Sequence, residues 1–415
     1  MRFFTRKKEM STRLLEPGAY LVFAVKILLG ALGVLLLTVL PYSLFWLWQS
    51  GDLAVERAVE TQARGDFAIF GSGISQDFVD YKLQLYAKVR PEIVAIGSSR
   101  VMQFRERCFA RKFLNMGGVA GNLPFLRSTL DAMLAIHKPE AVILGLDFWW
   151  FMPTWNPNPF QEEPPTSGSY TYSLANLKKP WDWLVTGKIS FADLLRPLTG
   201  DFRSDRFGIM AQQTDDGFAT DGSWYNTAES TGQKAPFDYQ FRDTTSQVLN
   251  GSKAFYHVPA GLPAPSQAHL DAFAEISCRL QSRGIRTFVF IAPLSDRIYQ
   301  IMREQKEKYP HLFGLAEALH ARGLNVLDLS NPRSLGANDC EFIDGFHGGE
   351  ITYLRVLRSL CDQWSALLAY VQIDKVNSAI AQWKGHVLVP DSRVTSLWET
   401  DFMHFGCKKR KQAAK

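Results

Sequence analysis

The sequence has few cysteines and lacks the short motifs that bind zinc or nucleotides. No G-x-G-x-x-G block follows an apolar run and no Walker motif is present, which argues against a nucleotide-binding domain. The cysteines form no C-x-x-C pair and no cluster with histidine, so we expect no disulfide framework, metal or cofactor. They are Cys108, Cys278, Cys340, Cys361 and Cys407. One disulfide is compatible with an oxidising compartment, and Cys340 with Cys361 is the pair to test.

Neither sign of charge is in large excess over the 415 residues, which can form one large or two ordinary domains. Charged residues make up 21% and hydrophobic residues 46%, a composition that argues against disorder. Much of the positive charge lies near the two ends, in Arg2, Arg6, Lys7, Lys8, Arg13, Lys408, Lys409, Arg410 and Lys411. No basic stripe interleaved with aromatics supports nucleic-acid binding, so contact with anionic lipid is the simpler interpretation.

One long run, Ile27 to Trp48, contains no charged residue. About 20 apolar residues cross a bilayer as a helix, so residues 19–49 are predicted to be a transmembrane signal anchor. Lys26 at one edge and Trp46 at the other suit the two membrane interfaces. A cleaved signal peptide is the main alternative, although no A-x-A-like site follows, and a buried core helix is another. The basic residues before the run predict a cytoplasmic N-terminus and an extracytoplasmic main domain, which is periplasmic in a bacterium.

After residue 90, short apolar runs alternate with segments of helical spacing. This alternation predicts a parallel sheet covered by helices on both faces. The predicted strands are 92–96, 113–115, 141–146, 287–291 and 325–329, and the predicted helices include 122–137, 270–280 and 350–370. The predicted segments are 1–18 (cytoplasmic), 19–49 (anchor), 50–90 (connection), 91–150 and 266–372 (two parts of one core), 151–265 (inserted subdomain) and 373–415 (C-terminal extension).

The insertion is rich in aromatic residues, namely Trp155, Trp181, Trp183, Trp224 and Tyr225. A structureless loop of that length is improbable in a compact domain, so it is expected to fold. Its aromatics either fill a small core or stack on the faces of sugars.

Reactive groups of parallel sheets gather beyond the carboxyl ends of the strands. Gly97-Ser98-Ser99-Arg100 follows the first strand, and a glycine-rich block that ends in Gly121-Asn122 follows the second. Serine there suits either a nucleophile or a helix cap, and glycine suits either an oxyanion donor or a plain turn. Asp344 precedes His347 by three residues, a spacing at which a carboxylate can orient an imidazole base or merely occupy a turn.

In this order the motifs resemble the SGNH (GDSL-like) hydrolase superfamily. The resemblance covers about 91–150 and 266–371. It implies a three-layer α/β/α sandwich with a five-stranded parallel sheet, of flavodoxin-like type. It also implies Ser99 as nucleophile in a Gly-Ser-Ser variant of the Gly-Asp-Ser block, Ser98 as a weaker alternative, Gly121 as an oxyanion donor, and Asp344 with His347 as the acid and base.

The third block of the superfamily departs from this resemblance. Where the superfamily has an asparagine, the chain reads Gly145-Leu146-Asp147. An ionised carboxylate repels an oxyanion, and the lost donor is worth about 3 kcal/mol if nothing replaces it. Asp147 is therefore either protonated, engaged elsewhere, for example in holding Arg100, or replaced in its role by another group.

The resemblance and the anchor together imply a serine esterase or acyltransferase that acts on acyl groups, O-acetyl in particular, of an envelope polysaccharide. Membrane-anchored proteins of this type include the D-alanyl transfer protein of lipoteichoic acid synthesis, and the alginate O-acetylation proteins are a less close analogy. A multipass acyl-exporting membrane protein is the partner expected of a transferase. The alternative is a catalytically inactive glycan-binding or assembly protein of the same fold.

Overall fold

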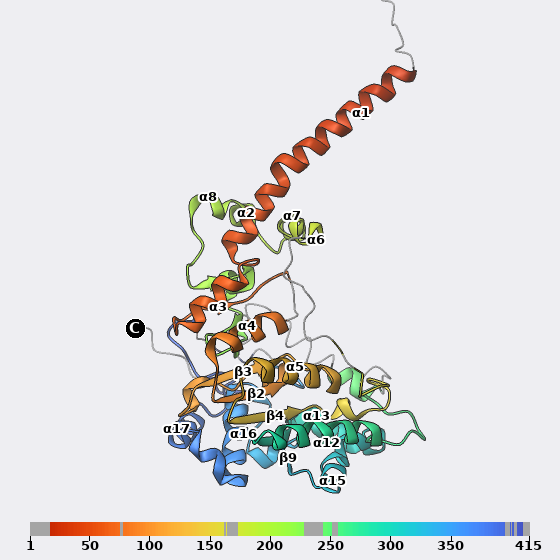
Figure 1. Cartoon of the computed structure of the whole chain (residues 1–415), viewed down its shortest axis with the longest axis vertical. Coiled ribbons are helices and arrows are strands. Elements are labelled where there is room, and N and C mark those ends of the chain that lie inside the picture. The colour runs from red at the N-terminus through yellow and green to blue at the C-terminus, as the bar shows by residue number, and fades with distance from the viewer. Residues whose placement is uncertain are drawn as a thin grey trace, which may run out of the picture. The chain divides into compact units, whose positions relative to one another are not determined.

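The computed structural model describes residues 17–74, 78–161, 163, 173–227, 244–250, 256–394, 399, 401 and 405–409 (Figure 1). The basic residues before position 17, together with Arg410 and Lys411, lie outside these ranges. Two compact units are present, one within residues 1–48 and 172–200 and one within 49–171 and 201–415. The stretch 151–265 is thus divided between the two units.

The first unit is helical. Its long N-terminal helix is made of α1 (Pro17–Val34), a π-helical turn at Leu35–Val39 and α2 (Leu40–Ser50). Among the described residues, this is the one helix long and apolar enough to cross a membrane, and an N-terminal signal sequence has the same properties. The π-turn precedes Pro41, whose ring cannot fit against a regular preceding turn. Three short helices complete the unit: α6 (Leu174–Leu177), α7 (Lys179–Val185) and α8 (Phe191–Thr199).

The second unit contains the predicted five-stranded parallel sheet, which is confirmed. Its strands are β2 (Ile93–Gly97), β3 (Phe113–Gly117), β4 (Ala141–Leu146), β8 (Arg286–Ile291) and β9 (Val326–Asp328). They run in the order β3-β2-β4-β8-β9, and every neighbouring pair is parallel. Their apolar side chains alternate between two buried clusters, so both faces of the sheet are covered.

Each face of this sheet packs against its own set of helices. One cluster includes residues of α4 (Val79–Val89), α5 (Leu123–Ile136), α12 (Gln267–Ser282) and α15 (Leu315–His320). The other includes residues of α16 (Glu350–Gln363) and α17 (Ile373–Trp383). The helix predicted over 350–370 ends earlier, because a 3-10 segment follows at Ser365–Ala369. Other helices of the unit include α3 (Val55–Ala63), α9 (Ile209–Thr214), α13 (Asp296–Glu304) and α14 (Pro310–Phe313).

A second, smaller sheet was not predicted from the sequence. It consists of β5 (Arg206–Phe207), β1 (Ile69–Phe70), β6 (Gly217–Phe218) and β7 (Trp224–Tyr225), in that order. Its strands have two residues each, too few to show an alternating pattern. They combine one segment before the large sheet with three from the insertion.

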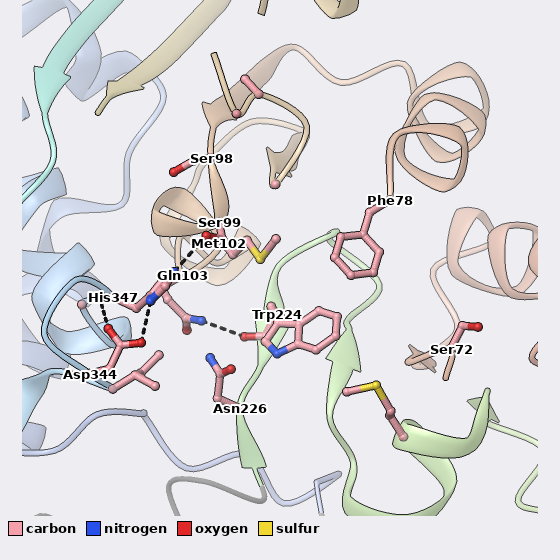
Figure 2. Close-up of a pocket in the computed structure, with 16 residues that line it drawn as sticks. Ser72, Phe78, Ser98, Ser99, Met102, Gln103, Trp224, Asn226, Asp344 and His347 are labelled. Atoms are coloured by element: carbon pink, nitrogen blue, oxygen red, sulfur yellow. Dashed lines mark hydrogen bonds and ion pairs between the residues drawn. The ribbon is translucent and has the colours of Figure 1, made fainter. Parts of the chain in front are cut away.

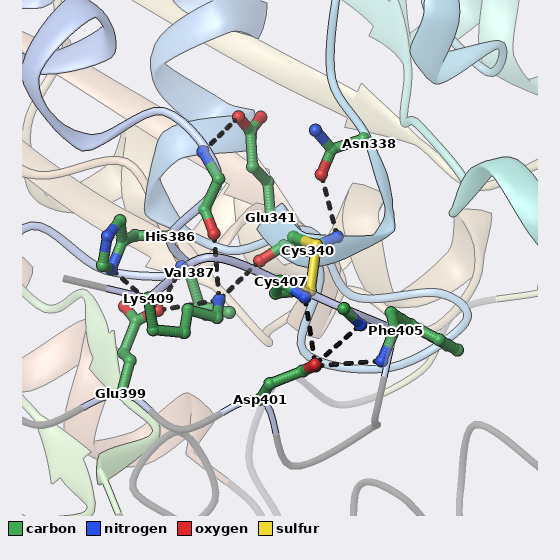
Figure 3. Close-up of a disulfide and its surroundings, with 12 residues drawn as sticks. Asn338, Cys340, Glu341, His386, Val387, Glu399, Asp401, Phe405, Cys407 and Lys409 are labelled. Atoms are coloured by element: carbon green, nitrogen blue, oxygen red, sulfur yellow. Dashed lines mark hydrogen bonds and ion pairs between the residues drawn. A yellow bond between two sulfur atoms is a disulfide. The ribbon is translucent and has the colours of Figure 1, made fainter.

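The structure contains one disulfide among its described residues, and it is not the pair expected from the sequence. Cys340 is bonded to Cys407 (Figure 3), whereas Cys361 is buried in α16 as a free thiol. Burial raises the pKa of the Cys361 thiol to about 12. The same tail is held by Lys409, whose amine contacts the Glu399 carboxylate at 3.0 Å and the Cys340 carbonyl at 2.8 Å. The predicted Cys340–Cys361 pair was wrong because Cys361 packs among apolar side chains inside the fold.

Replacing Cys407 with alanine is expected to lower the free energy of unfolding by about 2–4 kcal/mol, because the bond closes a long loop in the unfolded chain. The two cysteines are 67 residues apart in sequence. Denaturant unfolding under non-reducing conditions measures the loss, and Cys278→Ala is the control because this cysteine is free and exposed. Equal unfolding midpoints for the two variants would contradict the expectation.

Candidate active site

The first predicted block lies where β2 ends, at the carboxyl edge of the parallel sheet. Gly97 has a φ of +158°, and a Cβ there would lie 2.7 Å from the Gly145 carbonyl oxygen of the neighbouring strand. A side chain is thus excluded at the turn, and the chain passes close to β4. Ser99 follows as the first residue of a 3-10 turn, Ser99–Val101. This places its hydroxyl beyond the end of the sheet.

Ser99, His347 and Asp344 form a continuous chain of hydrogen bonds (Figure 2). The Ser99 Oγ lies 2.8 Å from Nε2 of His347, and Nδ1 of the same ring lies 2.8 Å from Oδ2 of Asp344. The other carboxylate oxygen of Asp344 accepts the backbone N–H groups of Phe346 and His347, each at 2.7 Å. The fold therefore brings together a serine and a histidine that are 248 residues apart, in the order nucleophile, base and orienting acid.

The charges along the Ser99–His347–Asp344 hydrogen bonds favour a histidine that accepts a proton. Burial alone would lower the pKa of His347, but the charge and hydrogen bond of Asp344 outweigh it and raise the pKa above the ordinary 6.5. Burial would raise the pKa of Asp344, yet His347 and two backbone N–H groups hold it below the ordinary 3.8. Asp344 is thus an anion that stabilises the imidazolium formed when His347 takes a proton.

Ser98 has a different role from its neighbour. Its hydroxyl accepts the backbone N–H of Arg100 at 3.2 Å and so caps the 3-10 turn that Ser99 begins. Figure 2 shows Ser98 apart from the hydrogen-bonded chain of Ser99, His347 and Asp344. Of the two serines predicted as nucleophiles, only Ser99 is bonded to the histidine.

The backbone N–H groups of Ser99 and Gly121 are the candidate oxyanion donors. Ser99 and Gly121 both line the pocket described below, and neither N–H has a hydrogen-bond acceptor among the described residues. Asn122, by contrast, accepts the N–H of Phe125 at 2.8 Å as the cap of α5, and it lies outside the pocket lining. The glycine-rich block after β3 therefore contributes Gly121 to the pocket, whereas Asn122 caps α5.

Arg100 and Asp147 form a buried ion pair behind the serine. Their side chains are each 1% exposed, and Nη1 of Arg100 donates to Oδ1 of Asp147 at 3.0 Å. Burial raises the pKa of Asp147, while Arg100 opposes the rise. The guanidinium also donates to the carbonyls of Phe346 (3.0 Å), Ala292 (2.9 Å) and Pro293 (2.5 Å). Arg100 therefore joins the ends of β4 and β8 to the loop that carries His347, and neither member of the pair lines the pocket.

Ser99, His347 and Asp344, called the triad below, line a pocket of about 470 Å³ within the second unit. Its wall includes five residues that no sequence motif indicated, namely Phe78, Gln103, Met210, Trp224 and Asn226. Two hydrogen bonds hold the backbone of Trp224. Its backbone N–H donates to the Met102 carbonyl at 3.0 Å, and its backbone carbonyl accepts the Gln103 side-chain amide at 3.1 Å. Its place in the aromatic-rich insertion was the only sequence signal for this wall. Among the described residues, no group of three or more His, Cys, Asp or Glu is placed to hold a metal.

Comparison with known proteins gives no independent assignment. No family model matches the chain, and no curated protein and no solved structure matches it either.

Proposed function

We propose that this chain is a membrane-anchored serine esterase or acyltransferase of SGNH type that acts on acyl groups, O-acetyl in particular, of an extracytoplasmic polysaccharide. The observation that carries the proposal is the hydrogen-bonded Ser99–His347–Asp344 chain at the edge of a parallel sheet. If the five strands are numbered by their order in the chain, they lie side by side as 2-1-3-4-5, which is the order of flavodoxin-like sheets. Both faces of the sheet are covered. These features support an α/β/α sandwich of the proposed type.

The chemistry follows from the three side chains. His347 Nε2 takes the hydroxyl proton as Ser99 Oγ bonds to the acyl carbon, and the tetrahedral oxyanion accepts the N–H groups of Ser99 and Gly121. The C–O bond to the alcohol then breaks, and the departing oxygen takes the proton from His347. Water, or a sugar hydroxyl, next attacks the acyl-serine with His347 as base and restores Ser99. Water as acceptor gives an esterase, and a sugar hydroxyl gives a transferase.

The pocket wall suits a sugar that carries a small acyl group. Trp224 offers an indole that packs against Phe78 and Phe218, with ring centroids 5.6 and 4.7 Å apart. Apolar Phe78 and Met210 line the same cavity. The side-chain amide of Asn226 faces this space and forms no hydrogen bond with a described residue. A ring that stacks on sugars beside an amide that binds hydroxyls is a suitable binding wall for a polysaccharide.

An extracytoplasmic location is supported by two separate features. The N-terminal helix is long and apolar enough to span a membrane, and the basic residues before it favour a cytoplasmic N-terminus. The Cys340–Cys407 disulfide suits an oxidising compartment. A transferase in this place needs an acyl donor, for which a multipass acyl-exporting membrane protein is the proposed partner.

The non-catalytic alternative has less support. A glycan-binding protein that had lost the chemistry would tolerate a serine and histidine out of hydrogen-bond reach. The observed 2.8 Å separation is instead that of a nucleophile and its base.

The pH dependence of acyl release tests the proposal. His347 must be neutral to accept the serine proton, and its raised pKa keeps it protonated to a higher pH than an ordinary histidine. The rate of acetyl release by the full-length protein from an O-acetylated polysaccharide or an aryl acetate should therefore rise with pH, with its midpoint above 6.5.

Asp344→Asn is the matched variant for this test, because an amide still accepts the two backbone N–H groups. Its NH₂ would face Nδ1 and place the imidazole proton on Nε2, so the plateau rate should fall about 10⁴-fold. A midpoint at or below 6.5 in the wild type, or a plateau unchanged in Asp344→Asn, would rule out the proposed base.

A further inference from the structure

Residues 173–200 form a helical collar, made of α6, α7 and α8, around one end of the long apolar helix (Figure 1). Tyr42 donates its hydroxyl to the Leu194 carbonyl at 2.6 Å, and Trp46 donates its indole N–H to the Asp193 carbonyl at 3.1 Å. Trp181 of the collar donates in turn to the Ser43 hydroxyl at 2.7 Å. The collar is therefore bonded to α2 from both directions.

The outer side of α8 carries an apolar stripe. Phe191, Leu195 and Leu198 are 65%, 37% and 66% exposed, and their i, i+4, i+7 spacing places them on one side of the helix. Leu194, which points the other way, is 2% exposed. Val185 at the end of α7 adds an apolar side chain that is 87% exposed. A contiguous apolar surface of this kind indicates a partner that is itself apolar.

The collar covers the part of the long apolar helix that follows its exposed stretch. Every described side chain from Tyr20 to Leu32 is exposed, whereas Ser43, Trp46 and Leu47 are 0% exposed beneath the collar. The 20 residues from Ile27 to Trp46 rise about 30 Å as a helix, which matches the ~30 Å hydrocarbon thickness of a bilayer, and Lys26 then stays at one edge. The collar contacts at Tyr42 and Trp46 thus lie at the other edge of that bilayer.

Charged and aromatic residues of the collar fit a head-group layer better than hydrocarbon. Lys178 pairs with Asp182 at 3.8 Å, and Arg196 pairs with Asp193 at 2.8 Å. Trp46 and Trp183 pack edge to face, with ring centroids 5.8 Å apart. Tryptophan with charged residues beside an apolar stripe is typical of helices that lie in the plane of a membrane interface.

We propose that the collar lies in the lipid interface of the membrane that α1 crosses, with Phe191, Leu195 and Leu198 inserted among the upper acyl chains. This inference rests on the proposed membrane anchor. It assigns lipid, not a protein, as the occupant of the stripe, and it makes α8 a second contact that fixes the depth of the anchor.

Depth-dependent quenching in lipid nanodiscs tests the inference on the full-length protein. Cys278→Ser removes the exposed free thiol, since Cys108 and Cys361 are buried and the other two cysteines are bonded. A bimane label is placed on a single cysteine at position 191 or 198. The references are Leu37→Cys, which is 79% exposed near the middle of the apolar run, and Ser282→Cys, which is exposed at the end of α12.

Labels at 191 and 198 should be quenched at least about twofold more than at 282, most strongly by lipids with a nitroxide near the head group. The label at 37 should be quenched most by a nitroxide near the bilayer centre. Quenching at 37 with none at 191 and 198 would overturn the collar inference, leave the anchor intact and indicate a protein partner for the stripe. No quenching at 37 would overturn the anchor itself.

Discussion

Replacing Ser99 with alanine is expected to lower acyl turnover by about 10⁴- to 10⁶-fold and to abolish covalent labelling by a fluorophosphonate probe. The Ser99 hydroxyl is the atom bonded to the triad histidine, at 2.8 Å from Nε2, so no neighbouring oxygen can take its place without a change of backbone. Folding should be retained, because the side chain is exposed and no other hydrogen bond of its hydroxyl is present among the described residues. Gel fluorescence and mass mapping of the labelled peptide measure the result.

Ser98→Ala is the matched control for this variant. Ser98 precedes the proposed nucleophile and lines the same pocket, but its hydroxyl caps the turn through the N–H of Arg100. Its loss should cost about 1 kcal/mol of stability and leave the probe reaction in place. Labelling that persists in Ser99→Ala, or that disappears only in Ser98→Ala, would contradict the assigned nucleophile. Chemical analysis of envelope glycan acylation in cells with each variant extends the comparison to the proposed substrate.

The parallel sheet was predictable because its strands are buried on both faces and so read as unbroken apolar runs. Ile93–Gly97 and Ala141–Leu146 both have this character. The approach of Ser99 to His347 then followed from the rule that the carboxyl ends of parallel strands share one edge. The distances and the charge state of the pair did not follow, because they depend on the loop that Asp344 holds through two backbone N–H groups.

The pocket wall and the collar could not be predicted, because tertiary contacts alone determine both. Trp224 lies in a strand of two residues, and Phe78 directly precedes α4, so no periodic pattern marked either as part of a site. The insertion was expected to fold as one subdomain, but 173–200 packs with the apolar helix and 201–227 with the second unit. Hydrogen bonds from Tyr42 and Trp46 to backbone carbonyls join 173–200 to the apolar helix. Such bonds cannot be predicted from sequence, because every residue carries a backbone carbonyl.

Replacing Asp147 with asparagine is expected to destabilise the protein without raising its activity. By resemblance, an amide at this position would restore an oxyanion donor. Here, however, the Asp147 side chain is 1% exposed, bonded to Arg100 and outside the pocket lining. The neutral amide would leave the guanidinium buried without its counter-charge, at a cost of at most about 3–5 kcal/mol. Denaturant midpoints and acetyl-release rates measured on the same preparations separate the two effects.

A double-mutant cycle with Arg100→Met completes this test. Removing Arg100 alone leaves a buried carboxylate and frees the Phe346 carbonyl beside His347, so stability and turnover should both fall. The double variant Arg100→Met/Asp147→Leu should lose less stability than the sum of the losses in Arg100→Met and in Asp147→Leu. The reason is that no unpaired charge remains buried in the double variant. An additive cycle, or a gain in turnover in Asp147→Asn, would instead place Asp147 beside the oxyanion. The expected result makes the pair a support that holds the histidine loop against the ends of β4 and β8, and leaves transition-state stabilisation to the backbone N–H groups of Ser99 and Gly121.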